Sequence, residues 1–139
     1  MIWFKEYNIS DWEQRSKGTI HDSLGIEVLK VGEDSITGRM PIDERTFQPM
    51  GILHGGASVV LAESLGSMAS AMVVNPDEYY VVGQIVNANH VRPGIKGYAT
   101  GTAKPVHLGT RSQIWDIEIF NDDQKLLCTV RLTMAVIKK

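Results

Sequence analysis

One carboxylate stands alone in the most apolar part of the sequence. From Met50 to Pro76 there is no Lys, Arg or Asp, and Glu63 is the only acid. A charge in a buried apolar segment costs on the order of several kcal/mol unless it is paired, protonated or beside a wet cleft. Glu63 is therefore either a structural oddity or a functional residue. A carboxylate can serve as a general base or as a nucleophile.

Small and polar residues surround this carboxylate at regular spacing. Ser67 follows Glu63 by four residues, so both side chains project from one face if the segment is helical. Gly66 lies between them and is expected to leave room for a ligand beside the carboxylate. Ser67 also has a simpler interpretation, which is small-residue packing in a crowded helix.

A second group of polar residues precedes the expected helix. His54 stands directly before Gly55 and Gly56, where a helix N-terminus offers free N–H groups and partial positive charge to a developing oxyanion. Gln48 adds an uncharged donor and acceptor that can orient a water or a carbonyl. No Ser or Cys has a readable His and Asp partner, so the pattern favours acyl transfer by a carboxylate over a triad. His54 alone would more often be a cap or a core histidine.

The element that must position Glu63 is a helix. The stretch from Gly56 to Val74 is longer than a usual strand, rich in Ala, Leu and Met, and closed by Asn-Pro. Apolar residues lie nearly all round it, which predicts a buried helix. Met68 and Met72 are then predicted to be core residues, although a flexible Met side chain also suits an adaptable acyl pocket.

The rest of the chain predicts short helices and strands. The capping-box pattern Ser-Asp-Trp-Glu, residues 10–13, predicts a helix from Asp11 to near Gly18, with a further turn at 20–24. Six β-rich stretches are separated by turn residues: 26–31, 35–40, 80–90, 98–107, 111–120 and 126–137. We therefore expect an α+β fold in one domain, residues 1–139, with an antiparallel sheet of five or six strands curled around the central helix. Such a sheet covers one side of the helix, so a second copy is expected to cover part of the rest.

Composition narrows the class of protein. Fourteen basic and sixteen acidic residues give a net charge of −2 with mixed signs, which offers no support for nucleic-acid binding. Cys128 is the only cysteine, so no internal disulfide or structural zinc site is readable. The apolar start is too short for a signal peptide, and Glu63 interrupts the only segment long enough to suggest a membrane span. We expect a soluble protein in a reducing cytoplasm.

The motif as a whole resembles a known family. The stretch GILHGGASVVLAESLGSMAS, with Gln-Pro before it and NANHVRP after it, resembles the hotdog-fold acyl-CoA thioesterases. The similar branch includes the phenylacetate-pathway, hydroxybenzoyl-CoA and dihydroxynaphthoyl-CoA thioesterases. The resemblance implies that Glu63 is the nucleophile or general base, that the Gly55 N–H and His54 polarise the thioester carbonyl, and that Gln48 and Ser67 place the water or carboxylate.

The resemblance also implies an assembly. In this family the site lies at a dimer interface, and dimers usually pair into tetramers. Gln48, His54 and Gly55 of one subunit would face Glu63, Ser64 and Ser67 of the other.

Coenzyme A binding is expected at two segments. The resemblance places the NANHVRP stretch beside the pantetheine and nucleotide, so His90 and Arg92 are assigned to CoA, and Arg is a natural bidentate partner of phosphate. The same stretch puts the polar side chains of Asn87, Asn89, His90 and Arg92 into what would otherwise be a buried strand, and structural pairing would explain one or two of them. The turn containing His107, Gly109 and Arg111 offers free N–H groups and an Arg to the nucleotide, although a solvated hairpin turn is nearly as good an interpretation. No separate cofactor is expected, because CoA is part of the substrate and product.

Three classes of function remain open from the sequence. The first is a thioesterase acting on acyl-CoA, aroyl-CoA or an acyl-carrier thioester, with Ser64 and Met68 among the substrate contacts. The second is a hotdog hydratase or dehydratase, which uses a His with an acid in a different arrangement. The third is a non-catalytic acyl-CoA-binding protein, which would be expected to carry a fused regulatory segment, and the short stretch before the first strand is not expected to hold one.

Overall fold

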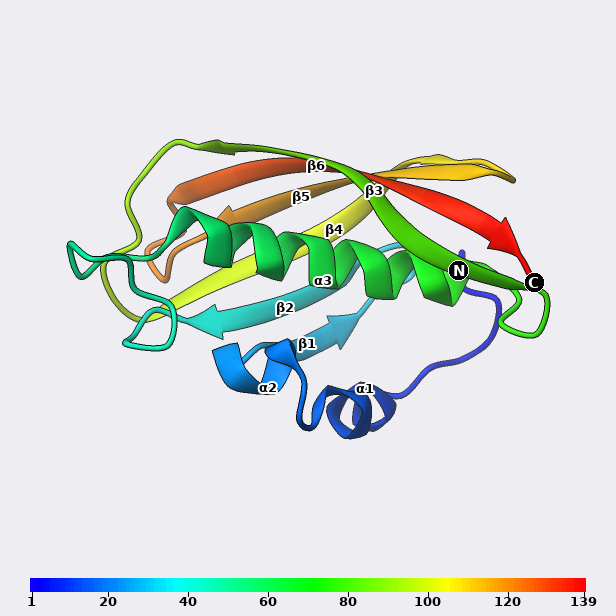
Figure 1. The fold of residues 1–139 in the computed structure, drawn as a ribbon, viewed down its shortest axis with the longest axis horizontal. Helices are drawn as coiled ribbons and strands as arrows, with labels where there is room; N and C mark the ends of the chain where they lie inside the picture. Colours follow the sequence, from blue (N-terminus) through cyan, green and yellow to red (C-terminus); the bar gives the residue numbers. More distant parts are fainter.

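A computed structural model describes residues 1–139, and one antiparallel sheet of six strands organises it (Figure 1). The strand order is β1-β2-β4-β5-β6-β3, and every neighbouring pair is antiparallel. The predicted α+β class and the six strands are confirmed. The strands are β1 (Glu27–Val31), β2 (Ile36–Pro41), β3 (Tyr79–His90), β4 (Tyr98–Leu108), β5 (Ser112–Phe120) and β6 (Leu126–Lys138).

The long helix α3 (Gly55–Val73) lies along the inner face of the curved sheet (Figure 1). Eleven of its residues are buried. By length and composition α3 could cross a membrane, yet 56% of its apolar window is buried inside the protein. It is the central helix of the fold, as predicted, and the sheet supplies its apolar surroundings.

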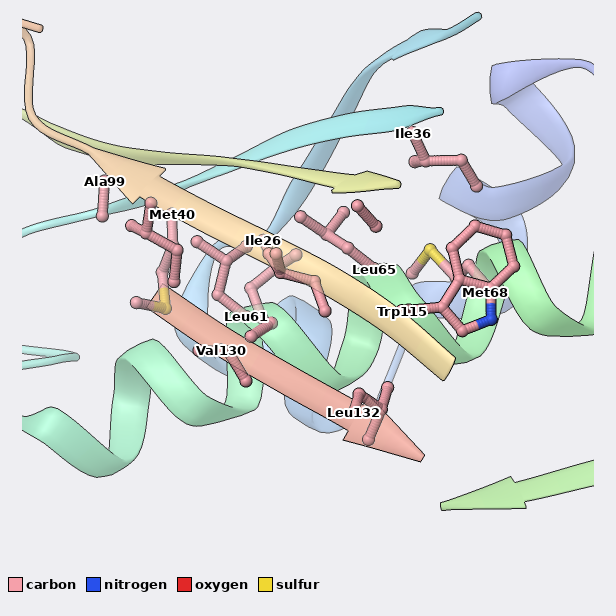
Figure 2. Packing of buried hydrophobic residues seen from close by; sticks show 14 of the residues in the cluster. Ile26, Ile36, Met40, Leu61, Leu65, Met68, Ala99, Trp115, Val130 and Leu132 are labelled. Atoms are coloured by element: carbon pink, nitrogen blue, oxygen red, sulfur yellow. The ribbon is translucent and has the colours of Figure 1, made fainter. Parts of the chain in front are cut away.

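The core fills the space between α3 and the sheet. Leu61 and Leu65 of α3 pack against the sheet in a core that also holds Trp115 of β5 and Leu132 of β6, and all four are fully buried (Figure 2). Gly66 belongs to this contact, because a Cβ there would lie 2.5 Å from Leu132 Cδ2. The prediction that Gly66 leaves room for a ligand beside Glu63 is therefore wrong. Gly66 instead allows α3 to approach β6 closely.

One stripe of α3 is less covered than the rest. Val59, Val60, Glu63, Ser67 and Ala71 are only partly buried, while the residues between them are mostly buried. Their spacing of three or four residues places them on one helical face. The sheet thus leaves one side of α3 open, and Glu63 lies on that side.

Two short helices precede the sheet. α1 (Ile9–Ser16) begins two residues before the predicted start, and its N-cap is Asn8, whose side chain makes no capping bond. The Asp11 N–H donates to the Asn8 carbonyl at 3.1 Å, so the first turn closes at Asn8 and Ser10 lies inside the helix. The predicted capping box is wrong for that reason. α2 (Ile20–Leu24) occupies the predicted turn and ends at Gly25, whose φ of 69° suits glycine.

β3 is an outer strand with an apolar surface. It pairs with β6 on one side only, and Tyr80, Val82, Ile85 and Val86 are exposed. Its pairing shifts between Gly83 and Ile85, which marks a β-bulge. The expectation of a buried strand is wrong for the single chain, because Asn87 and Asn89 lie exposed on this outer strand. The expected pairing is present, since the Asn89 amide donates to Asn87 Oδ1 at 3.4 Å.

Candidate active site

The open stripe of α3 borders a groove, called here the Glu63 groove, of about 360 Å³. Four of the predicted site residues line it together: Glu63, Ser64, Ser67 and Met68. Its other walls are Trp12, Arg15, His21, Ala71 and Val81. A lone carboxylate is tolerated in an apolar segment when it is paired, protonated or beside a wet cleft. Glu63 lies beside a cleft.

A glycine of the outer strand makes the position of Glu63 possible. A Cβ on Gly83 would overlap Oε1 of Glu63, so the carboxylate lies directly against the β3 backbone. The bulge of β3 begins at the same residue. Sequence analysis missed Gly83, although an isolated Gly inside a β-rich stretch is a known signal of a bulge or a close backbone approach.

Ser67 has a weak partner inside the chain. Its hydroxyl donates to Met134 Sδ at 3.7 Å, and a thioether is a poor acceptor. A stronger acceptor in the groove, such as a water or a carboxylate, can therefore take this bond at small cost. Ser67 and Glu63 line the same groove, as their spacing of four residues predicted.

His54 caps α3, and its cap defines its tautomer. Its Nδ1 accepts from the Gly56 N–H at 2.7 Å. In the neutral ring the proton then belongs on Nε2, which leaves an N–H on an exposed side chain. His54 can therefore cap α3 through Nδ1 and still serve as a hydrogen-bond donor through Nε2–H, because the two roles use different ring nitrogens.

The N–H of Gly55 is the remaining free donor at this end of α3. The Gly56 N–H is taken by the His54 ring, the N–H groups of Ala57 and Ser58 by the His54 carbonyl, while Gly55 N–H donates to no group of the chain. The His90 ring covers Gly55 so closely that a Cβ there would lie 2.9 Å from His90 Nε2. Only glycine allows this approach.

Gly55 and His90 border a second hollow, called here the Gly55 cavity, of about 430 Å³, which His54 does not line. Gln48, Gly55, His90 and Arg92 line it, all of them predicted site residues. The Gln48 side-chain carbonyl accepts from the Met50 N–H, which leaves its NH₂ group as a donor. Gln48, His54 and Gly55 therefore present donors, which is the requirement for polarising a carbonyl.

One chain does not bring the two groups of residues together. The Glu63 groove and the Gly55 cavity share no lining residue. Glu63 is eight residues beyond Gly55, which corresponds to about 12 Å along a helix axis. The donors at the helix start and the carboxylate cannot act on one thioester within a single subunit at this separation.

The residues predicted to bind CoA also lie in two separate parts of the chain's structure. His90 and Arg92 lie at the N-terminal end of α3, whereas His107, Gly109 and Arg111 belong to the β4–β5 hairpin and line neither hollow. The Gly109 N–H donates to the Ser112 carbonyl at 2.9 Å, so the prediction that it is free is wrong. The hairpin lies at the other end of the sheet (Figure 1).

The fold and the sequence together define the class of protein. Residues 50–128 match the family described as the thioesterase superfamily, which is more than half of the chain. The chain belongs to this superfamily, has its hotdog fold, and is an enzyme of the thioester hydrolase class. The resemblance found in the sequence is confirmed.

Relatives cover almost the whole chain. The 1,4-dihydroxy-2-naphthoyl-CoA hydrolase of Escherichia coli (strain K12) is 44% identical over 137 residues, 99% of this chain and 100% of the relative. The proofreading thioesterase EntH of Cronobacter turicensis is 43% identical over 136 residues, 98% of each chain.

A solved structure shows the same fold. The crystal structure of a mutant of thioesterase PA1618 from Pseudomonas aeruginosa is 46% identical with a TM-score of 0.99, and the match covers 100% of both chains.

Proposed function

We propose that this protein hydrolyses an acyl-CoA or aroyl-CoA thioester to the free acid and CoA, with Glu63 as nucleophile or general base. The observation that supports it is the open stripe of α3, where a single carboxylate borders a groove with the hydroxyl groups of Ser64 and Ser67. The name of the E. coli relative supports a CoA thioester as the substrate. The enzyme would work in the cytoplasm, as a soluble protein and without a cofactor.

In this proposal the helix start and the carboxylate act from opposite sides of the substrate. Gly55 N–H and His54 Nε2–H would hold the thioester oxygen, where negative charge develops, and Gln48 would help to orient it. Glu63 would attack the carbonyl carbon or remove a proton from water. Ser67, whose partner is the weak acceptor Met134, would help to place that water or carboxylate.

The two groups would meet between two copies of the chain. β3 offers a free edge and four exposed apolar side chains, a surface that soluble proteins usually cover. Antiparallel pairing of two β3 edges about a two-fold axis would continue the sheet and bring each Glu63 groove toward the partner's helix start. We therefore propose a homodimer with shared active sites, paired again into a tetramer.

Arg92 is the best-placed cation for the CoA phosphates. It is exposed, it borders the Gly55 cavity, and it has no carboxylate partner. Three other arginines are already paired: Arg39 with Glu27, Arg45 with Asp43 and Arg131 with Asp116. His90 would contact the pantetheine beside it, and the hairpin residues His107, Gly109 and Arg111 would reach the nucleotide from the partner subunit.

Release of free thiol tests the proposed reaction. The purified protein is mixed with benzoyl-CoA, acetyl-CoA, a long-chain acyl-CoA and an acyl-carrier thioester, and a thiol reagent follows CoA or carrier release. We expect turnover with at least one CoA thioester. Binding without thiol release would contradict hydrolysis, and hydration of an unsaturated acyl-CoA without thiol release would assign the site to a hydratase.

A further inference from the structure

One buried serine of α3 is placed differently from the other buried polar side chains. Thr46 donates to a backbone carbonyl at 2.7 Å, and Gln113 accepts from an indole at 3.1 Å. Ser64 lines the Glu63 groove, and Ser70 lines neither that groove nor the Gly55 cavity. Ser58 is 2% exposed, makes no hydrogen bond through its side chain, and lines the Gly55 cavity. The Ser58 hydroxyl is therefore uncommitted within the chain.

The oxygen of Ser58 is open to that cavity. Two buried side-chain atoms of the chain are fully covered and have no hydrogen-bond partner, Trp12 Nε1 and Ser70 Oγ. Ser58 Oγ also lacks a partner but is not one of the covered atoms, so the small exposed area of this residue includes its oxygen. A ligand in the Gly55 cavity can therefore reach the Ser58 hydroxyl, whereas it cannot reach that of Ser70.

Ser58 lies almost one turn beyond the proposed oxyanion donor. It follows Gly55 by three residues, which places both on one face of α3 and about 4.5 Å apart along the helix axis. The Ser58 N–H already donates to the His54 carbonyl at 3.3 Å. The hydroxyl is therefore the only donor of this residue that remains for a ligand.

The other walls of the cavity indicate which part of the substrate would lie there. Gln48 and Gly55 are proposed to hold the thioester oxygen, while His90 and Arg92 are proposed to contact CoA, and all four line this cavity. The Glu63 groove, which would receive the acyl group, shares no lining residue with it. The substrate segment beside Ser58 is therefore the one that joins the thioester sulfur to the rest of CoA.

That segment is the pantetheine arm, in which two methylene groups follow the sulfur and an amide follows them. Ile52, Leu53 and Leu127 line the cavity and suit the methylene groups. The amide loses water when it enters such a cavity, and it then needs a hydrogen-bond partner from the protein. The open hydroxyl of Ser58 is such a partner.

We infer that Ser58 Oγ hydrogen-bonds the pantetheine amide nearest the thioester sulfur, so that Ser58 is a further substrate-binding residue. A hydroxyl can accept from the amide N–H or donate to the amide carbonyl. The bond would hold the thioester oxygen in reach of the Gly55 N–H. This inference rests on the proposed thioesterase function, and it applies to CoA and acyl-carrier thioesters alike, because both contain pantetheine.

A pair of truncated thioesters tests this contact. The N-acetylcysteamine thioester keeps the amide, and the pentyl thioester has the same chain length with methylene groups in its place. Both carry the acyl group that the wild type hydrolyses best as a CoA thioester. The ratio of kcat/KM for the amide-containing thioester to kcat/KM for the pentyl thioester should be about fivefold higher in the wild type than in Ser58→Ala.

Ser70→Ala is the matched control. It removes a buried hydroxyl without a partner from the same helix, and Ser70 lines neither hollow, so this variant should keep the wild-type ratio. Thermal unfolding checks that both variants keep the fold. For the CoA thioester itself, kcat/KM should fall about fivefold in Ser58→Ala and stay unchanged in Ser70→Ala.

The outcomes distinguish this inference from the proposed function. An unchanged ratio in Ser58→Ala, or an equal fall in Ser70→Ala, would overturn the contact with the amide while hydrolysis stands. If the truncated thioesters react too slowly to compare, an unchanged kcat/KM of Ser58→Ala for the CoA thioester overturns it. If the wild type hydrolyses no thioester at all, the proposed function fails and the inference fails with it.

Discussion

The start of α3 and the open stripe two turns further along it hold the two groups of predicted catalytic residues in different ways. At the helix start, backbone and cap hydrogen bonds fix the donors, as in the bond from Gly56 N–H to the His54 ring. At the stripe, packing fixes the carboxylate: Glu63 lies against Gly83 of the outer strand. The first arrangement is local in sequence, whereas the second depends on a strand that follows the helix.

The difference assigns different tasks to the two regions. Free N–H groups at a helix start bind an oxyanion without any reorganisation of the protein. A carboxylate that attacks or removes a proton must reach its target with the correct orientation, and a strand backbone beside it limits where it can point. Because the two regions border separate hollows in one chain, each is expected to complete the site of a second copy.

The largest effect should come from removing the carboxylate. Glu63→Gln keeps the shape of the side chain and removes the base or nucleophile, so turnover should fall at least about a hundredfold with little change in substrate affinity. Steady-state and single-turnover kinetics measure both quantities. A variant that keeps most of the wild-type turnover would move the chemistry to another group.

Mixing two inactive variants tests whether the two regions belong to different subunits. His54→Ala and Glu63→Ala should each be nearly inactive. After equal amounts are unfolded, mixed and refolded, about a quarter of the wild-type sites should return, since half of randomly paired dimers are hybrids and each hybrid has one intact site.

A site within one subunit gives a different result. Native mass spectrometry establishes whether hybrid dimers form. Hybrids without recovered activity would show that His54 and Glu63 act within a single chain.

A smaller effect should follow from disturbing the support of Glu63. In Gly83→Ala the new Cβ would displace the end of a flexible side chain, so the fold should remain stable while turnover falls about tenfold. Thermal unfolding and kcat report the two effects separately. In a Glu63→Gln background the same change should cost little more, and a full additional tenfold loss there would mean that Gly83 acts independently of the carboxylate.

The smallest effect should come from removing a side chain proposed to contact the CoA nucleotide. Arg92→Ala should raise the KM for CoA thioesters about fivefold and leave kcat nearly unchanged, because a phosphate contact remote from the thioester supplies uniform binding. Lys104→Ala, an exposed cation that lines neither the Glu63 groove nor the Gly55 cavity, is the control. An unchanged KM in Arg92→Ala would leave this arginine without a role in CoA binding.

Much of the helix could be predicted because its rules are local. The apolar segment, its Gly-Gly start and the common face of Glu63 and Ser67 all follow from spacing along one helix. The capping-box prediction for residues 10–13 also relied on local sequence rules, and it was wrong because the backbone turn closes at Asn8 and places Ser10 inside the helix. The prediction for Gly66 was wrong because a glycine can make room for a ligand or for a close packing contact, and only the position of Leu132 decides between the two.

The sequence by itself determined the set of elements, the burial of α3 and the residues able to do chemistry on it, since each of these depends on neighbours within a few turns or strands. Only the tertiary structure decided that β3 is an outer strand, that Gly83 supports Glu63, and that Trp12 lines the groove beside the carboxylate. It also separated Gly55 from Glu63 into two hollows. These contacts join residues far apart in the chain, and strand pairing and packing, not spacing along the sequence, place them together.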